Sequence, residues 1–213
     1  MATDLGFKQY FAYFCIIMKF IYNRFPDDPE FEPGGKWVPL KESANLWVIQ
    51  LQALPFMILN VLAMILLLWA IGISFELDSL LILLSFVIFA PVHEFIHALF
   101  FPESILSKNI YFGFTTKGFV PFAAYIGEMK RNTFIRSLLA PFVIITIIGF
   151  ACLLLLGSNS LIEHIIVFNA LGACADCLGV YLLLRQVPRN AIVRNKLIRT
   201  YWKTEENTLS LKS

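Results

Sequence analysis

Four long apolar stretches constrain this chain more than any other feature of its sequence. They run over about residues 46–73, 80–101, 134–156 and 161–184. A helix needs roughly 20 apolar residues to cross the hydrocarbon core of a bilayer, and each stretch reaches that length. Hydrophobic residues make up 58% of the chain and charged residues only 15%, a composition too apolar for a soluble domain. We therefore expect an all-α polytopic membrane protein with about four transmembrane helices.

The basic residues are confined to alternate segments of the chain. None of the 17 Lys and Arg lies between Lys41 and Lys108, or between Arg136 and Arg185. Loops on the cytoplasmic side of a membrane carry an excess of Lys and Arg. Both termini and the loop between the second and third spans are therefore expected to be cytoplasmic.

These patterns divide the chain into three parts. Residues 1–44 are expected to form a cytoplasmic or interfacial N-terminal segment, residues 45–186 a single membrane domain, and residues 187–213 a basic cytoplasmic tail. Because the tail directly follows a span, anionic lipid headgroups are a simpler partner for it than nucleic acid. We expect contact with the lipid bilayer and no nucleic-acid binding.

The N-terminal segment contains one further candidate helix. Residues 5–25 are rich in aromatic side chains but are interrupted by Lys8, Lys19 and Arg24. Such a segment favours an amphipathic helix lying at the membrane interface over a fifth span. The Pro-rich and Gly-rich residues 26–44 indicate an irregular linker.

The cytoplasmic loop between the second and third spans contains a candidate β-hairpin. Residues 110–125 are dense in aromatic and β-branched residues, with a break at Thr116, Lys117 and Gly118. Pro121 lacks a backbone donor, so its strand belongs at a sheet edge. The alternative is a loop anchored at the membrane surface by its Tyr and Phe side chains.

The second span carries a metal-binding motif, His93-Glu94-Phe95-Ile96-His97. Two histidines four residues apart project from one face of a helix and can share a metal ion, with the glutamate beside them as a general base. Ionisable side chains inside a span are costly and usually mark function. The motif predicts zinc as cofactor, with His93 and His97 as ligands and Glu94 as the catalytic base; two core histidines are the alternative.

A catalytic zinc ion normally has three protein ligands, and depth in the membrane indicates the third. His97 and His93 lie four and eight residues before Phe101, at a depth of roughly 6–12 Å. Asp176 lies nine residues before Arg185, at a depth of roughly 13 Å. The similar depths, and the cost of an unpaired carboxylate in a span, favour Asp176 as the third ligand.

Other donors fit this site less well. Glu163 and His164 lie 13 and 12 residues before Asp176 on the last span, roughly 18 Å or more from it and near the opposite face of the membrane. The loop residues Glu103 and Glu128 are not excluded by geometry. Cys174 and Cys177 allow a Cys2His2 site, but on a helix they point away from the direction of Asp176.

Asn169 lies seven residues before Asp176 and shares its helix face. Its amide could hydrogen-bond the backbone of a substrate or a group of the metal site. It could also satisfy a contact between helices. These alternatives stay open in the sequence.

The order of these elements resembles the site-2 protease group of intramembrane metalloproteases, and most closely the bacterial putative zincin peptidases. The resemblance runs from Leu80 to Leu184 and includes the HExxH motif, the aromatic hairpin, Leu139-Ala140-Pro141 and the segment from Asn169 to Asp176. It implies a bacterial cell membrane location and zinc on His93, His97 and an Asp that matches Asp176. It departs at Cys177, which follows Asp176 with no proline nearby, so no helix break is visible at the site.

These observations predict an intramembrane zinc metalloprotease with its active site near the cytoplasmic face. Zinc would acidify a water molecule, and Glu94 would take its proton and return it to the leaving amine. The substrate would be a membrane protein or peptide, held in extended form by strand addition to the hairpin. Candidate substrate contacts are Asn169, Phe112, Phe114 and Phe119.

Two other function classes compete with this prediction. The first is a membrane scaffold that binds metal without hydrolysis. The second is a small ion transporter whose intramembrane His and Asp form an ion path. Substitution of Glu94 separates the enzyme from the scaffold, and bound stoichiometric zinc argues against the transporter.

Overall fold

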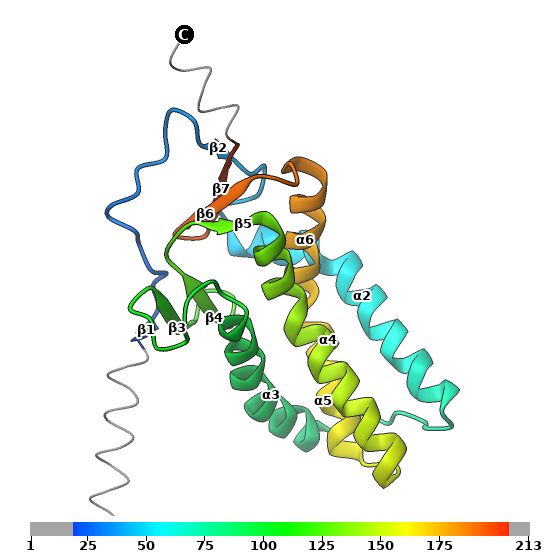
Figure 1. The fold of residues 1–213 in the computed structure, drawn as a ribbon. Helices are drawn as coiled ribbons and strands as arrows, with labels where there is room; N and C mark the ends of the chain where they lie inside the picture. The colour runs from blue at the N-terminus through cyan, green and yellow to red at the C-terminus, as the bar shows by residue number, and fades with distance from the viewer. Residues whose placement is uncertain (1–18, 205–213) are drawn as a thin grey trace, which may run out of the picture.

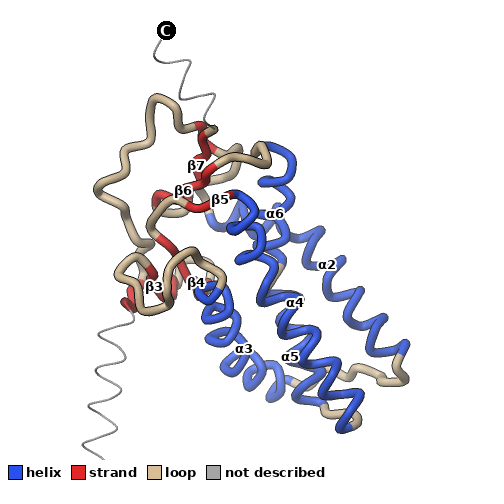
Figure 2. The backbone as a smooth tube through the Cα atoms, in the orientation of Figure 1, coloured by secondary structure: helices blue, strands red, loops and turns tan. Residues whose placement is uncertain are grey.

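The structure is a computed structural model that describes residues 19–204. Within that range the helices are α2 (Leu46–Ala70), α3 (Ser79–Leu99), α4 (Arg131–Leu156), α5 (Ser160–Gly172) and α6 (Cys174–Gln186). The strands are β1 (Lys19–Tyr22), β2 (Val38–Pro39), β3 (Ile110–Thr115), β4 (Val120–Tyr125), β5 (Met129–Lys130), β6 (Ile192–Lys196) and β7 (Arg199–Lys203). The helices run side by side, and both sheets lie at one end of them (Figures 1 and 2).

Four helical segments are long and apolar enough to cross a membrane: α2, α3, α4, and α5 with α6 taken together. They coincide with the four stretches expected from the sequence to within a few residues. Side-chain oxygens of Asn45, Asp78 and Asn159 accept hydrogen bonds from the first turns of α2, α3 and α5, and so cap them. Many large apolar side chains on these helices are exposed, including Leu155, which is 82% exposed. An apolar surface of that extent is typical of a protein that contacts lipid.

The fourth apolar segment, expected as one helix over residues 161–184, is divided at Ala173 into α5 and α6. Ala173 has φ −72° and ψ 1°, which departs from helical geometry, although its N–H still donates to the carbonyl of Asn169. The break follows Gly172, a residue that weakens a helix interior. The site therefore has a helix break beside Asp176 after all, without the proline that would have indicated it.

The first sheet has the strand order β1-β3-β4. The expected hairpin is present, since β3 and β4 pair antiparallel and the strand containing Pro121 forms an edge. The helix expected over residues 5–25 is wrong at residues 19–22, which form β1 in parallel register with β3. The remainder of that expected helix, up to residue 18, lies outside the described residues. In the strand, the backbone groups of these residues form hydrogen bonds with β3, whereas in a surface helix they would bond within the helix.

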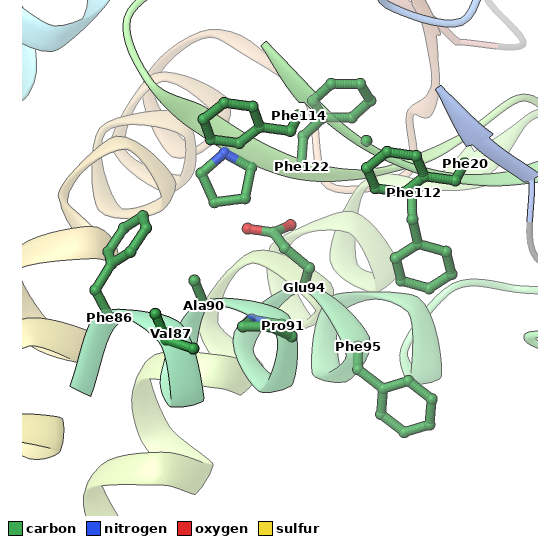
Figure 3. A pocket seen from close by; sticks show the side chains of 12 residues that line it. Phe20, Phe86, Val87, Ala90, Pro91, Glu94, Phe95, Phe112, Phe114 and Phe122 are labelled. Atoms are coloured by element: carbon green, nitrogen blue, oxygen red, sulfur yellow. The ribbon is translucent and has the colours of Figure 1, made fainter. Parts of the chain in front are cut away.

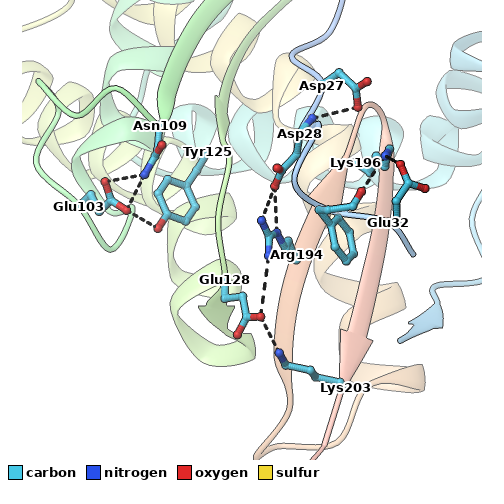
Figure 4. A network of polar contacts seen from close by, with 11 residues as sticks. Asp27, Asp28, Glu32, Glu103, Asn109, Tyr125, Glu128, Arg194, Lys196 and Lys203 are labelled. Carbon is cyan, nitrogen blue, oxygen red and sulfur yellow. Dashed lines mark hydrogen bonds and ion pairs between the residues drawn. The ribbon is translucent and has the colours of Figure 1, made fainter. Parts of the chain in front are cut away.

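The second sheet, of order β2-β7-β6-β5, was not expected, so the description all-α with one hairpin is too narrow. It joins residues before α2, the end of the loop between α3 and α4, and residues after α6. Val38 pairs with Trp202, and Met129 pairs with Val193. Polar contacts reinforce the sheet (Figure 4), with Arg194 bonded to Asp28 at 2.6 Å and Lys203 to Glu128 at 2.5 Å.

Helices α4 and α5 approach each other closely at Gly149. Gly149 lies on α4 opposite Ile166 of α5, and a Cβ at Gly149 would stand 2.5 Å from the Ile166 side chain. A residue without a side chain is therefore required for this approach. This packing, together with the contacts of α3 with α4 and α5, brings the motif of α3 against the start of α6.

Candidate metal centre

His93 and His97 lie one helical turn apart on α3 and face the interior of the helix bundle. Their exposed fractions are 5% and 7%, and their ring centroids are 4.8 Å apart. Four-residue spacing on a helix brings both imidazoles to one face, as the motif predicts. The two imidazole rings therefore point toward the same buried position between α3 and the other helices.

Each imidazole is oriented by a hydrogen bond at Nδ1. Nδ1 of His97 lies 2.7 Å from the carbonyl oxygen of Ser137 on α4, and Nδ1 of His93 lies 2.9 Å from Oδ1 of Asn169 on α5. Both partners are acceptors, so Nδ1 carries the proton in each ring. Nε2 of each histidine then keeps its lone pair for a metal ion.

Asp176 completes the group from the first turn of α6. Its Oδ2 lies 3.2 Å from Nε2 of His93 and 3.5 Å from Nε2 of His97. The break at Ala173 precedes it by three residues, so Asp176 stands at the start of a helix. The structure thus brings together the three residues that the sequence proposed as ligands from two distant segments.

The donor set fits the cofactor that the motif implies. Zinc bonds to histidine nitrogen and carboxylate oxygen are about 2.0–2.2 Å long, and neighbouring ligand atoms of a tetrahedral site then stand roughly 3.3 Å apart. The two distances from Asp176 Oδ2 lie on either side of that value. Two nitrogens and one carboxylate oxygen are also a donor set of catalytic zinc sites.

Glu94 lies beside the two histidines on the side toward the first sheet. One carboxylate oxygen of Glu94 and one nitrogen of each histidine lie within 4.8 Å of one another. Its Oε2 accepts a hydrogen bond of 2.6 Å from the backbone N–H of Ala123 in β4. The carboxylate points into a cavity of about 450 Å³ between α3 and the strands (Figure 3).

The residues predicted to contact substrate occupy different places. Phe112 and Phe114 of β3 line the cavity around Glu94. Phe119 does not line it; it lies in the hairpin turn with φ 53° and is 73% exposed. Asn169 is fully buried and bonds His93 and the carbonyl of Phe142, which favours the metal-site alternative left open by the sequence.

The alternative ligands have other partners. Glu163 accepts a hydrogen bond from Ser158, and His164 accepts one from the N–H of Asp78, at the end of the bundle away from the sheets. Asn60 of α2 donates to the sulfur of Cys177 at 3.5 Å. None of these three residues, Glu163, His164 and Cys177, belongs to the group around His93 and His97.

The loop carboxylate Glu103 is also engaged elsewhere. Hydrogen bonds from Ser107, Asn109 and Tyr125 hold the pKa of Glu103 below its usual value. Figure 4 shows the bonds from Asn109 and Tyr125. Burial of the Tyr125 side chain, together with its hydrogen bond to Glu103, raises the pKa of Tyr125 to about 12. This network fastens the loop after α3 to β4, and so holds the strand against Glu94.

Two contacts of the site are made by backbone groups, so no side chain in the sequence marks them. The carbonyl of Ser137 and the N–H of Ala123 are backbone groups; every residue supplies a carbonyl, and every residue except proline supplies an N–H. A pattern of side chains therefore cannot locate them. The only available signals were the predicted hairpin, which places strands in the loop after the motif, and the predicted third span.

Comparison with known proteins identifies one family. The model of a family described as putative zincin peptidase matches residues 86–192, half of the 213 residues. The matched segment includes His93, Glu94, His97 and Asp176. No curated protein and no solved structure matches the chain.

Proposed function

The chain belongs to the putative zincin peptidase family, and on that premise we propose that it is an intramembrane zinc metalloprotease. Its substrates are peptide bonds in or beside membrane segments. One observation carries the proposal: the donor atoms of His93, His97 and Asp176 converge within helices long and apolar enough to cross a membrane. Glu94 stands next to this group, where a zinc peptidase needs its base.

The proposed orientation places the site near the cytoplasmic face. The ends of the helices that meet the sheets carry the basic residues, among them Lys41, Lys108, Arg131 and Arg185, and the opposite ends carry none. Loops with such a bias stay in the cytoplasm. His97 lies two residues before the end of α3 at Leu99, on the side of the sheets. A substrate would therefore be cut close to the cytoplasmic surface.

His93, His97 and Asp176 would hold the zinc ion, which supplies Lewis acidity at the attacking water and at the scissile carbonyl. Asn169 and the Ser137 carbonyl keep the two imidazoles in the orientation and tautomer that present Nε2. Burial of these residues excludes bulk water from the group. The protein thus prepares the ligands before any substrate arrives.

Glu94 carries the proton in the proposed hydrolysis. Its carboxylate accepts a proton from the attacking water and donates that proton to the nitrogen of the leaving amine. The N–H of Ala123 holds Oε2 and so fixes the plane of the carboxylate. The other oxygen is then free for proton transfer.

The edge strand β4 offers a place for the substrate backbone. The N–H and C=O of one residue in an antiparallel strand point to the same side. Because the Ala123 N–H reaches Glu94, both groups of Ala123 point away from β3 and along the open edge. An extended substrate that pairs with this edge would lie directly beside Glu94.

Substitution of Glu94 tests the proposal. In liposomes, Glu94→Gln should lower proteolysis of a transmembrane substrate by roughly 100-fold or more, because the general base is lost. Glu76→Gln is the matched control, since Glu76 is an exposed glutamate beyond the far end of α2. Undiminished proteolysis in Glu94→Gln contradicts the mechanism. Bound zinc without any proteolysis by the wild type favours the scaffold alternative.

A further inference from the structure

The cavity beside Glu94 is lined almost entirely by apolar side chains. Phe86, Val87 and Ala90 contribute from α3, and Phe112 and Phe114 contribute from β3. Among the lining residues in the described part of the chain, Glu94 alone is charged. At about 450 Å³ the cavity is within the size range of sites that bind small ligands or side chains.

The register of the first sheet explains why one wall of the cavity is aromatic. Phe20 pairs with Phe112 in parallel register, and Phe112 pairs with Ala123 in antiparallel register. Paired residues share a face of the sheet, as do residues two apart, so Phe20, Phe112 and Phe114 share one face. Phe20 is 64% exposed, so this aromatic face is only partly covered by the protein.

A strand added to the edge of β4 would extend the same face. Every second side chain of that strand would point to the side of Phe112 and Phe114, and its backbone would lie at Ala123. Glu94, bonded to Ala123, marks the position of the reacting peptide bond. A side chain next to that bond therefore falls into the cavity.

We propose that this cavity selects substrates with a large apolar side chain, of leucine or phenylalanine size, at a position next to the scissile bond. This inference rests on the proposed function, because it takes Glu94 as the base. The occupant is a peptide side chain and not a lipid acyl chain, because an acyl chain would desolvate the Glu94 carboxylate without offering a polar group in return. A peptide brings backbone amides to the same edge.

Two substitutions should change the selection in opposite directions. In peptides that differ only at this position, the wild type should cleave the Phe or Leu peptide roughly 10- to 100-fold faster, in kcat/KM, than the Ala peptide. Val87→Phe adds a ring at a position that is 61% exposed, and should reduce that preference toward equality. Phe114→Ala enlarges the cavity and should extend the preference to Trp. Phe56→Ala, the same kind of truncation on α2, should keep the wild-type order, because Phe56 packs against Tyr181 and does not line the cavity.

Unchanged preference in both Val87→Phe and Phe114→Ala overturns the inference. It is also overturned if Phe56→Ala shifts the preference as much as Phe114→Ala, because selection would then not depend on the residues that line the cavity. Val87→Phe alone decides the matter if Phe114→Ala does not fold, since residue 87 lies on an exposed helix surface.

A binding measurement separates this inference from the proposed function. Fluorescent versions of the same peptides are titrated into Glu94→Gln protein in nanodiscs, with empty nanodiscs as the blank. The Phe peptide should bind roughly 10-fold more tightly than the Ala peptide, and Val87→Phe should abolish the difference. This order supports the cavity even if the wild type cleaves no peptide. Equal binding, or a photoreactive lipid that labels the cavity and is not displaced by the Phe peptide, overturns it.

Discussion

Asn169 is the residue whose role the structure defines most sharply beyond the motif. It is fully buried, its Oδ1 accepts from Nδ1 of His93, and its Nδ2 donates to the carbonyl of Phe142. The equivalent partner of His97 is the Ser137 carbonyl, which no side-chain substitution removes. Among the described residues, Asn169 is therefore a side chain through which the orientation of His93, a proposed metal ligand, can be tested.

Replacing Asn169 with alanine should weaken zinc binding by roughly 10- to 100-fold, because His93 loses the acceptor that fixes its tautomer and ring. Competition with a chelator measures the affinity. Asn60→Ala is the matched control, since Asn60 is also a buried asparagine on a long apolar helix but donates to the Ala170 carbonyl and the Cys177 sulfur, and bonds no histidine. Equal losses of zinc affinity in the two variants would show that Asn169 acts only through packing.

At the scale of single residues, the sequence predicted the site where metal-binding side chains follow one another at helical spacing. His93, Glu94 and His97 stand out by spacing, and Asp176 by the cost of a carboxylate in an apolar segment. The structure brings these residues together. The roles of Ala123 and Ser137 could not be predicted, because both act through backbone groups.

The element that most affects the site is the broken pair α5 and α6. The break at Ala173 starts a new helix whose first turn contains Asp176. α5 in turn packs on α4 through Gly149, which faces the fully buried Ile166. The long helices themselves followed from the length of the apolar stretches. The break did not, because glycine and alanine, the residue types at 172 and 173, also occur inside continuous helices.

Gly149→Leu should destabilise the protein by about 1–3 kcal/mol, because a side chain at this position forces α4 and α5 apart. Thermal unfolding in detergent, followed by circular dichroism, should show a lower Tm. Gly34→Ala is the control, since a Cβ at Gly34 meets no heavy atom within 4 Å. An unchanged Tm for Gly149→Leu would mean that the close approach of α4 and α5 is absent in the protein.

The whole molecule is held together at the sheet end by segments far apart in the sequence. The second sheet joins Val38 to Trp202, and the buried side chain of Asp28 bonds Arg194. This sheet could not be predicted, because its strands are short and their pairing partners lie up to 164 residues apart. The ring of Phe31 lies 4.6 Å from the guanidinium of Arg194, which adds a cation–π contact to the ion pair.

Asp28→Asn should destabilise this sheet by up to about 3 kcal/mol, because the largely buried Arg194 guanidinium loses its closer anionic partner and keeps only Glu128, at 3.9 Å. Hydrogen exchange of the β6 and β7 amides should become faster. Glu32→Gln is the control: Glu32 pairs with Lys196, but its side chain is 87% exposed, and exposed pairs contribute little. Equal exchange in both variants would contradict the structural role of the buried pair.

The central claim is that His93, His97 and Asp176 from separate helices hold one zinc ion. Metal analysis of the purified protein tests it most directly, with the wild type compared with Asp176→Ala and with Glu163→Ala as a second acidic residue of the same apolar segment. The account predicts one zinc per chain in the wild type and in Glu163→Ala, and loss of zinc in Asp176→Ala. A wild type without zinc, or full zinc occupancy in Asp176→Ala, would contradict it.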